Sequence, residues 1–143
     1  MHSHDYVDNE VLHVTPVQLV CLLYAKAVEK LGQARVHLEA GRIPERSEAI
    51  GRVMEIVAEL QGSLDPEQGG EIARDLDRLY IYIQERLVQA NGEQTAEPIK
   101  ESMRLMSTLL EGWKECRDSM DLPRVPAIPA ESAQAGAVRE WRL

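Results

Sequence analysis

Four stretches of this chain repeat apolar residues at spacings of three and four, and residues that stop or start helices separate these stretches. Such spacing places apolar side chains on one face of an α-helix, because successive residues are turned by about 100°. No stretch alternates apolar and polar residues with a period of two for long enough to form a sheet. We therefore predict an all-α protein, an antiparallel up-down bundle of four helices with room for a fifth.

The first helix has the clearest start signal. Thr15 is suited to the N-cap, Pro16 to the first helical position, and Gln18 completes a capping box three residues after the cap. The apolar stripe then continues to Gly41, where a glycine favours the end of a helix.

The other helices follow from similar signals. Pro44 opens the second, whose stripe ends at Leu64, and Pro98 opens the fourth, which fades near Met120. The third is predicted from Glu71 to the pair Asn91-Gly92, which favours a left-handed C-cap. A glycine pair weakens helix formation over residues 64–70, so that segment is predicted to be a turn.

The chain divides into three parts by composition. Pro123, Pro126 and Pro129 recur at the three-residue period of polyproline II and forbid further helix. We predict an N-terminal arm at 1–15, the helical bundle at 16–120 and a Pro-rich C-terminal extension at 121–143.

Charge and hydropathy exclude several classes of partner. The chain carries 24 acidic and 16 basic residues, a net charge of −8, and no run of five basic residues, so we expect no nucleic-acid binding. No apolar run approaches the ~20 residues of a membrane span, so no membrane insertion is expected. The N-terminus has no basic residue before Lys26 and no apolar signal core, which predicts a cytoplasmic protein.

No group of residues indicates catalysis. Glu10 and His13 form one Glu-x-x-His pair, but a di-iron bundle needs a second copy and further glutamates. Cys21 and Cys116 lie in apolar or helical patterns and are expected to stay reduced. We expect no enzyme activity, no metal and no cofactor. One alternative stays open: His37 lies off the apolar stripe, where a histidine phosphotransfer bundle would carry its histidine.

The chain has more apolar surface than one bundle core can bury. Residues 19–25 are all apolar, which covers a helix on every side for two turns, so Leu22 must face away from the core. Ile81 and Val88 likewise lie opposite the core stripe of the third helix. These residues indicate either a dimer or flanking segment that packs on them, or a groove for an amphipathic partner helix.

Two blocks of sequence resemble the flagellar secretion chaperones of the FliS family. The first block consists of Tyr6, Val11, Thr15-Pro16 and Leu23-Tyr24. The second and more specific block consists of Ser63-Leu-Asp-Pro-Glu-Gln-Gly-Gly-Glu-Ile-Ala73, Leu79-Tyr80-x-Tyr82, Leu87, Ala90-Asn91 and Trp113-Lys-Glu115. The resemblance covers about residues 6 to 116. It departs from the family pattern at Ala25 and Ile81, where members usually carry an acidic or amide residue after each Leu-Tyr pair.

The resemblance implies a cytoplasmic chaperone that binds the C-terminal segment of flagellin and prevents its polymerisation before flagellar type III secretion. It also allows the flagellar export gate and regulators of flagellin as further partners, with the chaperone a monomer or weak homodimer. A histidine phosphotransfer protein, or another helical interaction module, is the alternative. Combining the surplus apolar positions with the resemblance, we predict that the client contacts Tyr6, Val11, Pro16, Leu19, Leu22, Leu23, Tyr24, Leu79, Tyr80, Ile81, Ile83, Leu87 and Val88.

Overall fold

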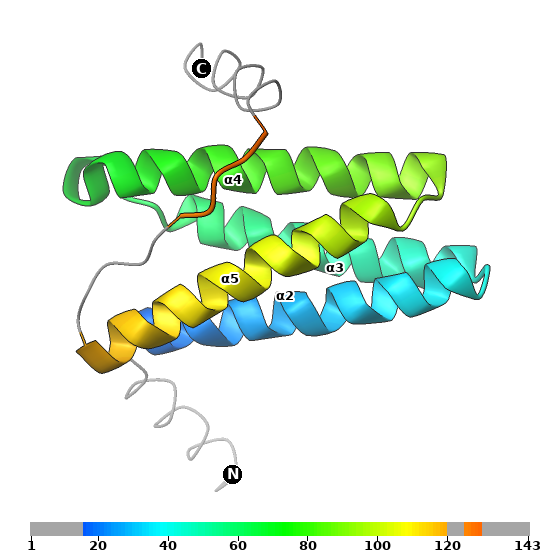
Figure 1. The fold of residues 1–143 in the computed structure, drawn as a ribbon, viewed down its shortest axis with the longest axis horizontal. Coiled ribbons are helices and arrows are strands. Elements are labelled where there is room, and N and C mark those ends of the chain that lie inside the picture. Colours follow the sequence, from blue (N-terminus) through cyan, green and yellow to red (C-terminus); the bar gives the residue numbers. More distant parts are fainter. Residues whose placement is uncertain (1–15, 120–124, 130–143) are drawn as a thin grey trace, which may run out of the picture.

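The computed structural model describes residues 16–119 and 125–129. The first of these ranges forms four helices: α2 (Pro16–Glu39), α3 (Ile43–Gly62), α4 (Pro66–Glu93) and α5 (Glu97–Ser119) (Figure 1). The described residues contain no strand, and the predicted all-α fold is confirmed. The N-terminal arm lies outside the described residues.

The helices form a bundle in which consecutive helices run in opposite directions (Figure 1). Helix α2 packs against α3 and α5, and α4 packs against the same two helices from the other side. Helices α2 and α4 make no backbone contact with each other, so they lie diagonally across the core. This is the up-down arrangement that the short connections predicted.

The core is built from the predicted apolar stripes. Each helix turns a row of residues inward at spacings of three and four, and these side chains are almost fully shielded from solvent. The largest of them are Tyr24, Leu31, Val53, Val57, Leu76, Leu79, Tyr80, Ile83, Leu87, Ile99, Met106 and Leu109.

The predicted turn over residues 64–70 is wrong from Pro66 onward, because α4 begins there. The Asp65 carboxylate caps this helix by accepting hydrogen bonds from the backbone N–H groups of Glu67 (3.0 Å) and Gln68 (3.3 Å). The helix is interrupted only at Gly70, where φ is 55° and ψ is −131°. A good cap and an N1 proline therefore outweigh the low helix propensity of the glycines, and the break is confined to one residue.

The predicted end of the third helix at Asn91-Gly92 is also wrong. Helix α4 continues to Glu93, and the left-handed residue that caps it is Gln94, with φ 55° and ψ 46°. The Asn91 side chain accepts hydrogen bonds from Arg46 Nε (3.0 Å) and Ser47 Oγ (3.1 Å), both on α3. Because Asn91 is held against α3, it stays within the helix and the cap moves past it.

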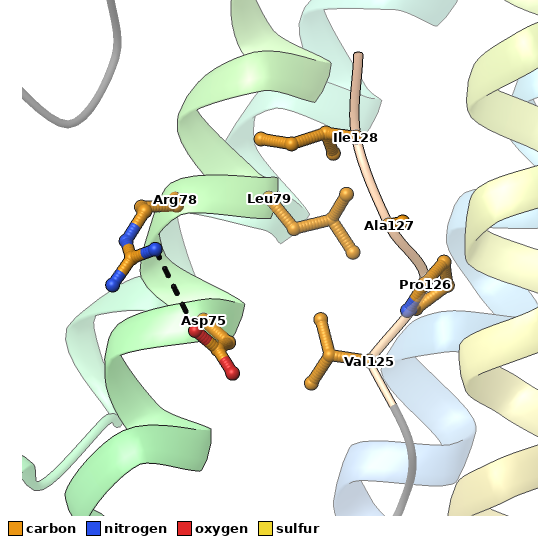
Figure 2. A pocket seen from close by; sticks show the side chains of 7 residues that line it. All are labelled: Asp75, Arg78, Leu79, Val125, Pro126, Ala127 and Ile128. Atoms are coloured by element: carbon orange, nitrogen blue, oxygen red, sulfur yellow. Dashed lines mark ion pairs between the residues drawn. The ribbon is translucent and has the colours of Figure 1, made fainter. Parts of the chain in front are cut away.

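Helix α5 starts beside α4 and then leaves it to pack along α2 (Figure 1). Near its start, Glu101 Oε1 accepts hydrogen bonds from Tyr82 Oη and Arg86 Nε of α4, each at 2.6 Å. Residues 125–129, which we call the strap, are not helical and lie between α4 and α5 (Figures 1 and 2). Within the described part of the chain, no helix combines the length and the apolar character that a bilayer crossing requires.

Candidate functional site

The two Leu-Tyr pairs meet in the centre of the bundle. Tyr24 of α2 and Tyr80 of α4 join their hydroxyl groups in a buried hydrogen bond, and their ring centroids are 6.5 Å apart. The Trp113 ring of α5 lies 6.4 Å from the Tyr24 ring. Three separated parts of the resembling sequence therefore form one aromatic cluster, which links the diagonal helices through their side chains.

This cluster is built for stability rather than for acid–base chemistry. Burial raises the pKa of Tyr24 to about 12 and moves the pKa of Tyr80 further above its ordinary value, in both cases by penalising the phenolate. Both hydroxyls therefore stay protonated at neutral pH and satisfy each other in a core that water does not reach.

An apolar hollow of about 240 Å³ opens beside the cluster. It lies at the end of the bundle where α2 and α4 begin and α3 and α5 end (Figure 1). We call it the Trp113 hollow, and its walls are Leu60, Ser63, Leu64, Asp65, Gln68, Gly69, Ile72, Ala73, Leu76, Tyr80 and Trp113. It thus unites the residue block 63–73 with the aromatic cluster, the two features on which the family resemblance most depends.

The local sequence explains why this hollow forms. The Asp65 cap turns the chain sharply from α3 into α4, and Leu64 lies in the wall of the hollow just before the first turn of α4. At Gly69 a side chain has no room, because an added Cβ would lie 2.8 Å from the Cβ of Ala73. Glycine therefore lets the short first turn of α4 fold closely over the rest of the helix.

Two further apolar surfaces lie on the outside of the bundle. On α2, Leu19 and Leu22 are 51% and 60% exposed. On α4, Val88 is 58% exposed and Ile81 is half-buried, and together with Gln84 and Glu85 they line a shallow depression of about 450 Å³. The prediction that Leu22 and Val88 face away from the core is confirmed.

The structure does not bring the two outer surfaces together. Tyr24 and Tyr80 lie on the inner faces of the diagonal helices α2 and α4 and meet across the core, so residues on the outer faces of the two helices point away from the bundle in different directions. Leu22 and Ile81 therefore belong to separate surfaces, and one partner helix of ordinary length cannot contact both.

The remaining predicted site residues differ in exposure. Pro16 is exposed, and Leu23 is half-buried against the core. Tyr6 and Val11 lie outside the described residues. The others are at most 1% exposed and support the surface from within: Tyr24, Leu79, Tyr80, Ile83 and Leu87.

Sequence reasoning missed the walls of the Trp113 hollow, including Leu60, Leu64 and Ile72. The signal was present, because an up-down bundle brings the end of the second helix, the start of the third and the end of the fourth to the same end. It also missed two exposed apolar residues at the opposite end of the bundle, Val36 and Ile43.

Three further reactive side chains stood out in the sequence, His37, Cys21 and Cys116. His37 Nδ1 accepts a hydrogen bond from Arg42 Nε at 2.9 Å across the turn between α2 and α3. Cys21 and Cys116 are free thiols, and burial raises the pKa of Cys21. Over residues 16–119 and 125–129, no three His, Cys, Asp or Glu side chains gather closely enough to hold a metal.

Comparisons with known proteins all give the same family. Residues 1–120 match the family described as flagellar protein FliS. The flagellar secretion chaperone FliS of Salmonella typhimurium is 38% identical over 110 residues, which are 76% of this chain and 82% of the relative. The flagellar secretion chaperone FliSB of Pseudomonas aeruginosa is 37% identical over 107 residues, 75% of this chain and 85% of the relative.

Proposed function

Since the chain belongs to the FliS family of flagellar secretion chaperones, we propose that it binds the C-terminal segment of flagellin in the cytoplasm and keeps flagellin unpolymerised until export. The family is one of chaperones rather than enzymes. The observation that carries the proposal is the Trp113 hollow, an open apolar site walled by the residues on which the family resemblance depends.

The proposed contact uses the hollow as an anchor. An apolar side chain of the client enters between Leu64, Ile72 and Trp113, which leave room for it without rearrangement of the core. From there an amphipathic helix of the client extends along the exposed side of α2, over Leu19 and Leu22, at the same end of the bundle.

The energetics suit a client that folds as it binds. A segment that is disordered alone loses conformational entropy when it becomes helical, and buried apolar area must outweigh that loss. Each Å² of apolar surface that is buried contributes about 25 cal/mol. Burial of the hollow and of the exposed leucines by the client therefore offsets its loss of conformational entropy, which burial of a polar surface would not do.

The separate face of α4 allows a second partner. Because Ile81 and Val88 point away from the α2 surface, they remain accessible while a client segment occupies α2 and the Trp113 hollow. The export gate, a regulator of flagellin, a further part of the same client or a second copy of the chaperone are the partners that this surface is proposed to bind.

Calorimetric titration with a peptide spanning the C-terminal segment of the host flagellin tests the proposal. Leu64→Asp places a charge in the wall of the hollow and should weaken binding at least tenfold. Ile43→Asp is the control, because it also changes an apolar residue to a charge, but at an exposed position at the opposite end of the bundle. Equal affinities of the two folded variants, each checked by its melting temperature, would contradict the proposed site.

A further inference from the structure

The strap packs against α4 beside Leu79. In Figure 2 the side chains of Val125 and Ile128 point toward α4, where Leu79 points back at them. Val125 and Ile128 are half-buried and pack against the core; Pro126 between them is also half-buried, while Ala127 and Pro129 are exposed. The strap therefore contacts the core through two apolar side chains three positions apart.

The sequence of the strap suits a segment that is partly ordered before it docks. Three-residue spacing places side chains on one side of a polyproline II helix, and prolines restrict the free chain to such conformations. Pro126, which lies between Val125 and Ile128, thus lowers the conformational entropy that these two residues lose on docking. Because it loses little entropy, such a segment needs only a few contacts to dock.

The surface beneath the strap is a cleft with a charged rim. Its α4 wall is formed by Asp75, Arg78 and Leu79, and Asp75 Oδ1 and Arg78 Nη1 form an ion pair at 3.7 Å. The strap does not fill the site completely, since about 230 Å³ remain open between the two. Leu79 is only 1% exposed, and it belongs to the second Leu-Tyr pair predicted to contact the client.

We propose that this cleft is a second client-binding site for an extended segment with two apolar residues three apart, and that the strap occupies it until a client segment displaces it. The inference rests on the proposed function. It adds the kind of client segment that binds at this cleft of α4 and identifies the strap as its competitor. The occupant seen in the structure carries the argument, because it shows which kind of peptide the cleft accepts.

Tethering makes the competition effective. The strap follows α5 after a short connection, so its local concentration at the cleft is on the order of millimolar. A client that needs the cleft binds only the open fraction, and its apparent dissociation constant rises in inverse proportion to that fraction. A strap that is docked about ten times as often as it is free weakens client binding about tenfold.

Ile128→Asp tests the proposal, because a charge at position 128 opposes docking against Leu79. Pro129→Asp is the matched control, since it adds the same charge to an exposed position of the same segment. In a calorimetric titration of the full chain with the flagellin C-terminal peptide, Ile128→Asp should bind about tenfold more tightly than wild type, and Pro129→Asp within twofold of it. Unchanged or weaker binding by Ile128→Asp overturns the proposal.

Limited trypsin digestion provides a second measurement. Cleavage after Arg124, identified by mass spectrometry, should be faster in Ile128→Asp than in Pro129→Asp, and the peptide should accelerate it in wild type. Equal cleavage rates in the two variants, or no acceleration by bound peptide, contradict strap displacement. If wild type does not bind the peptide at all, the proposed function itself fails, whereas binding that is indifferent to Ile128→Asp refutes only the strap.

Discussion

The hydrogen bond between Tyr24 and Tyr80 gives a sharp prediction about stability. Tyr24 is fully buried and Tyr80 is 1% exposed, so Tyr80→Phe leaves the Tyr24 hydroxyl in the core without its partner. A buried unsatisfied hydroxyl costs about 1–3 kcal/mol. Tyr24→Phe should cost a similar amount, but the double variant removes both hydroxyls and should cost clearly less than the sum. We expect a coupling free energy of about 1–2 kcal/mol.

The same pair predicts a loss of stability in alkali. The pKa of Tyr24 is raised to about 12 in the folded state, against about 10 in the unfolded chain. Its contribution is therefore complete below pH 10 and is lost as the pH rises through 12, because the unfolded state releases its proton first. At pH 11 the loss from Tyr24 alone is on the order of 1 kcal/mol, and Tyr80 adds to it in the same direction.

Urea unfolding followed by circular dichroism measures both effects. Wild type, the two single variants and the double variant are compared at pH 7 to obtain the coupling, and wild type and Tyr24→Phe are compared again at pH 11. Strictly additive single variants would show that the two hydroxyls do not satisfy each other. An alkaline loss as large in Tyr24→Phe as in wild type would refute the assignment of that loss to this residue.

Three further predictions concern single features of the bundle. Leu22→Asp should weaken flagellin-peptide binding in calorimetry and leave the melting temperature nearly unchanged, because this side chain is 60% exposed. Leu31→Asp should instead unfold the protein. Equal losses of stability in the two variants would place both side chains in the core. Asn91→Ala removes the acceptor of Arg46 Nε, a buried charged group. The free energy of unfolding, measured by urea titration, should fall by about 1–3 kcal/mol. An unchanged value would mean that the other contacts of Arg46 are enough to stabilise its buried charge. Deletion of residues 2–12 should tighten binding of the flagellin peptide and increase self-association in light scattering, if the arm covers the Leu22 region in the absence of client; weaker binding would instead make the arm a direct contact.

The sequence predicted the helices well because each helix is determined by local chemistry. Apolar spacing places Leu31 and Leu76 in the core whatever the neighbouring helices are. The helix ends were less predictable, because they depend on contacts that spacing does not reveal. Asn91 accepts hydrogen bonds from Arg46 and Ser47, which are far away in the sequence, and these contacts favour its place inside the helix.

The candidate site was predictable only in part. The excess of apolar residues identified Leu22 and Val88 as outward-facing, since a helix cannot turn every side to one core. Which surfaces adjoin depends on how the helices are arranged around the core, and the diagonal placement of α2 and α4 separates Leu22 from Ile81. The cleft under the strap depends on where α5 leaves α4, and no periodicity along the chain encodes that divergence.

The position at which the strap docks could likewise not be predicted from the sequence. The prolines correctly indicated non-helical chain over residues 125–129. Their three-residue period also matches the spacing of Val125 and Ile128, but only the position of Leu79 on the flank of α4 reveals what those two side chains contact.

A seeded polymerisation assay tests the central claim most directly. Purified flagellin of the host is mixed with short filament seeds, and filament growth is followed by light scattering at increasing concentrations of the chaperone. The account predicts that growth stops near one chaperone per flagellin, and that Leu64→Asp requires a clear excess while Ile43→Asp does not. Growth at an unchanged rate in the presence of excess wild-type protein would contradict it.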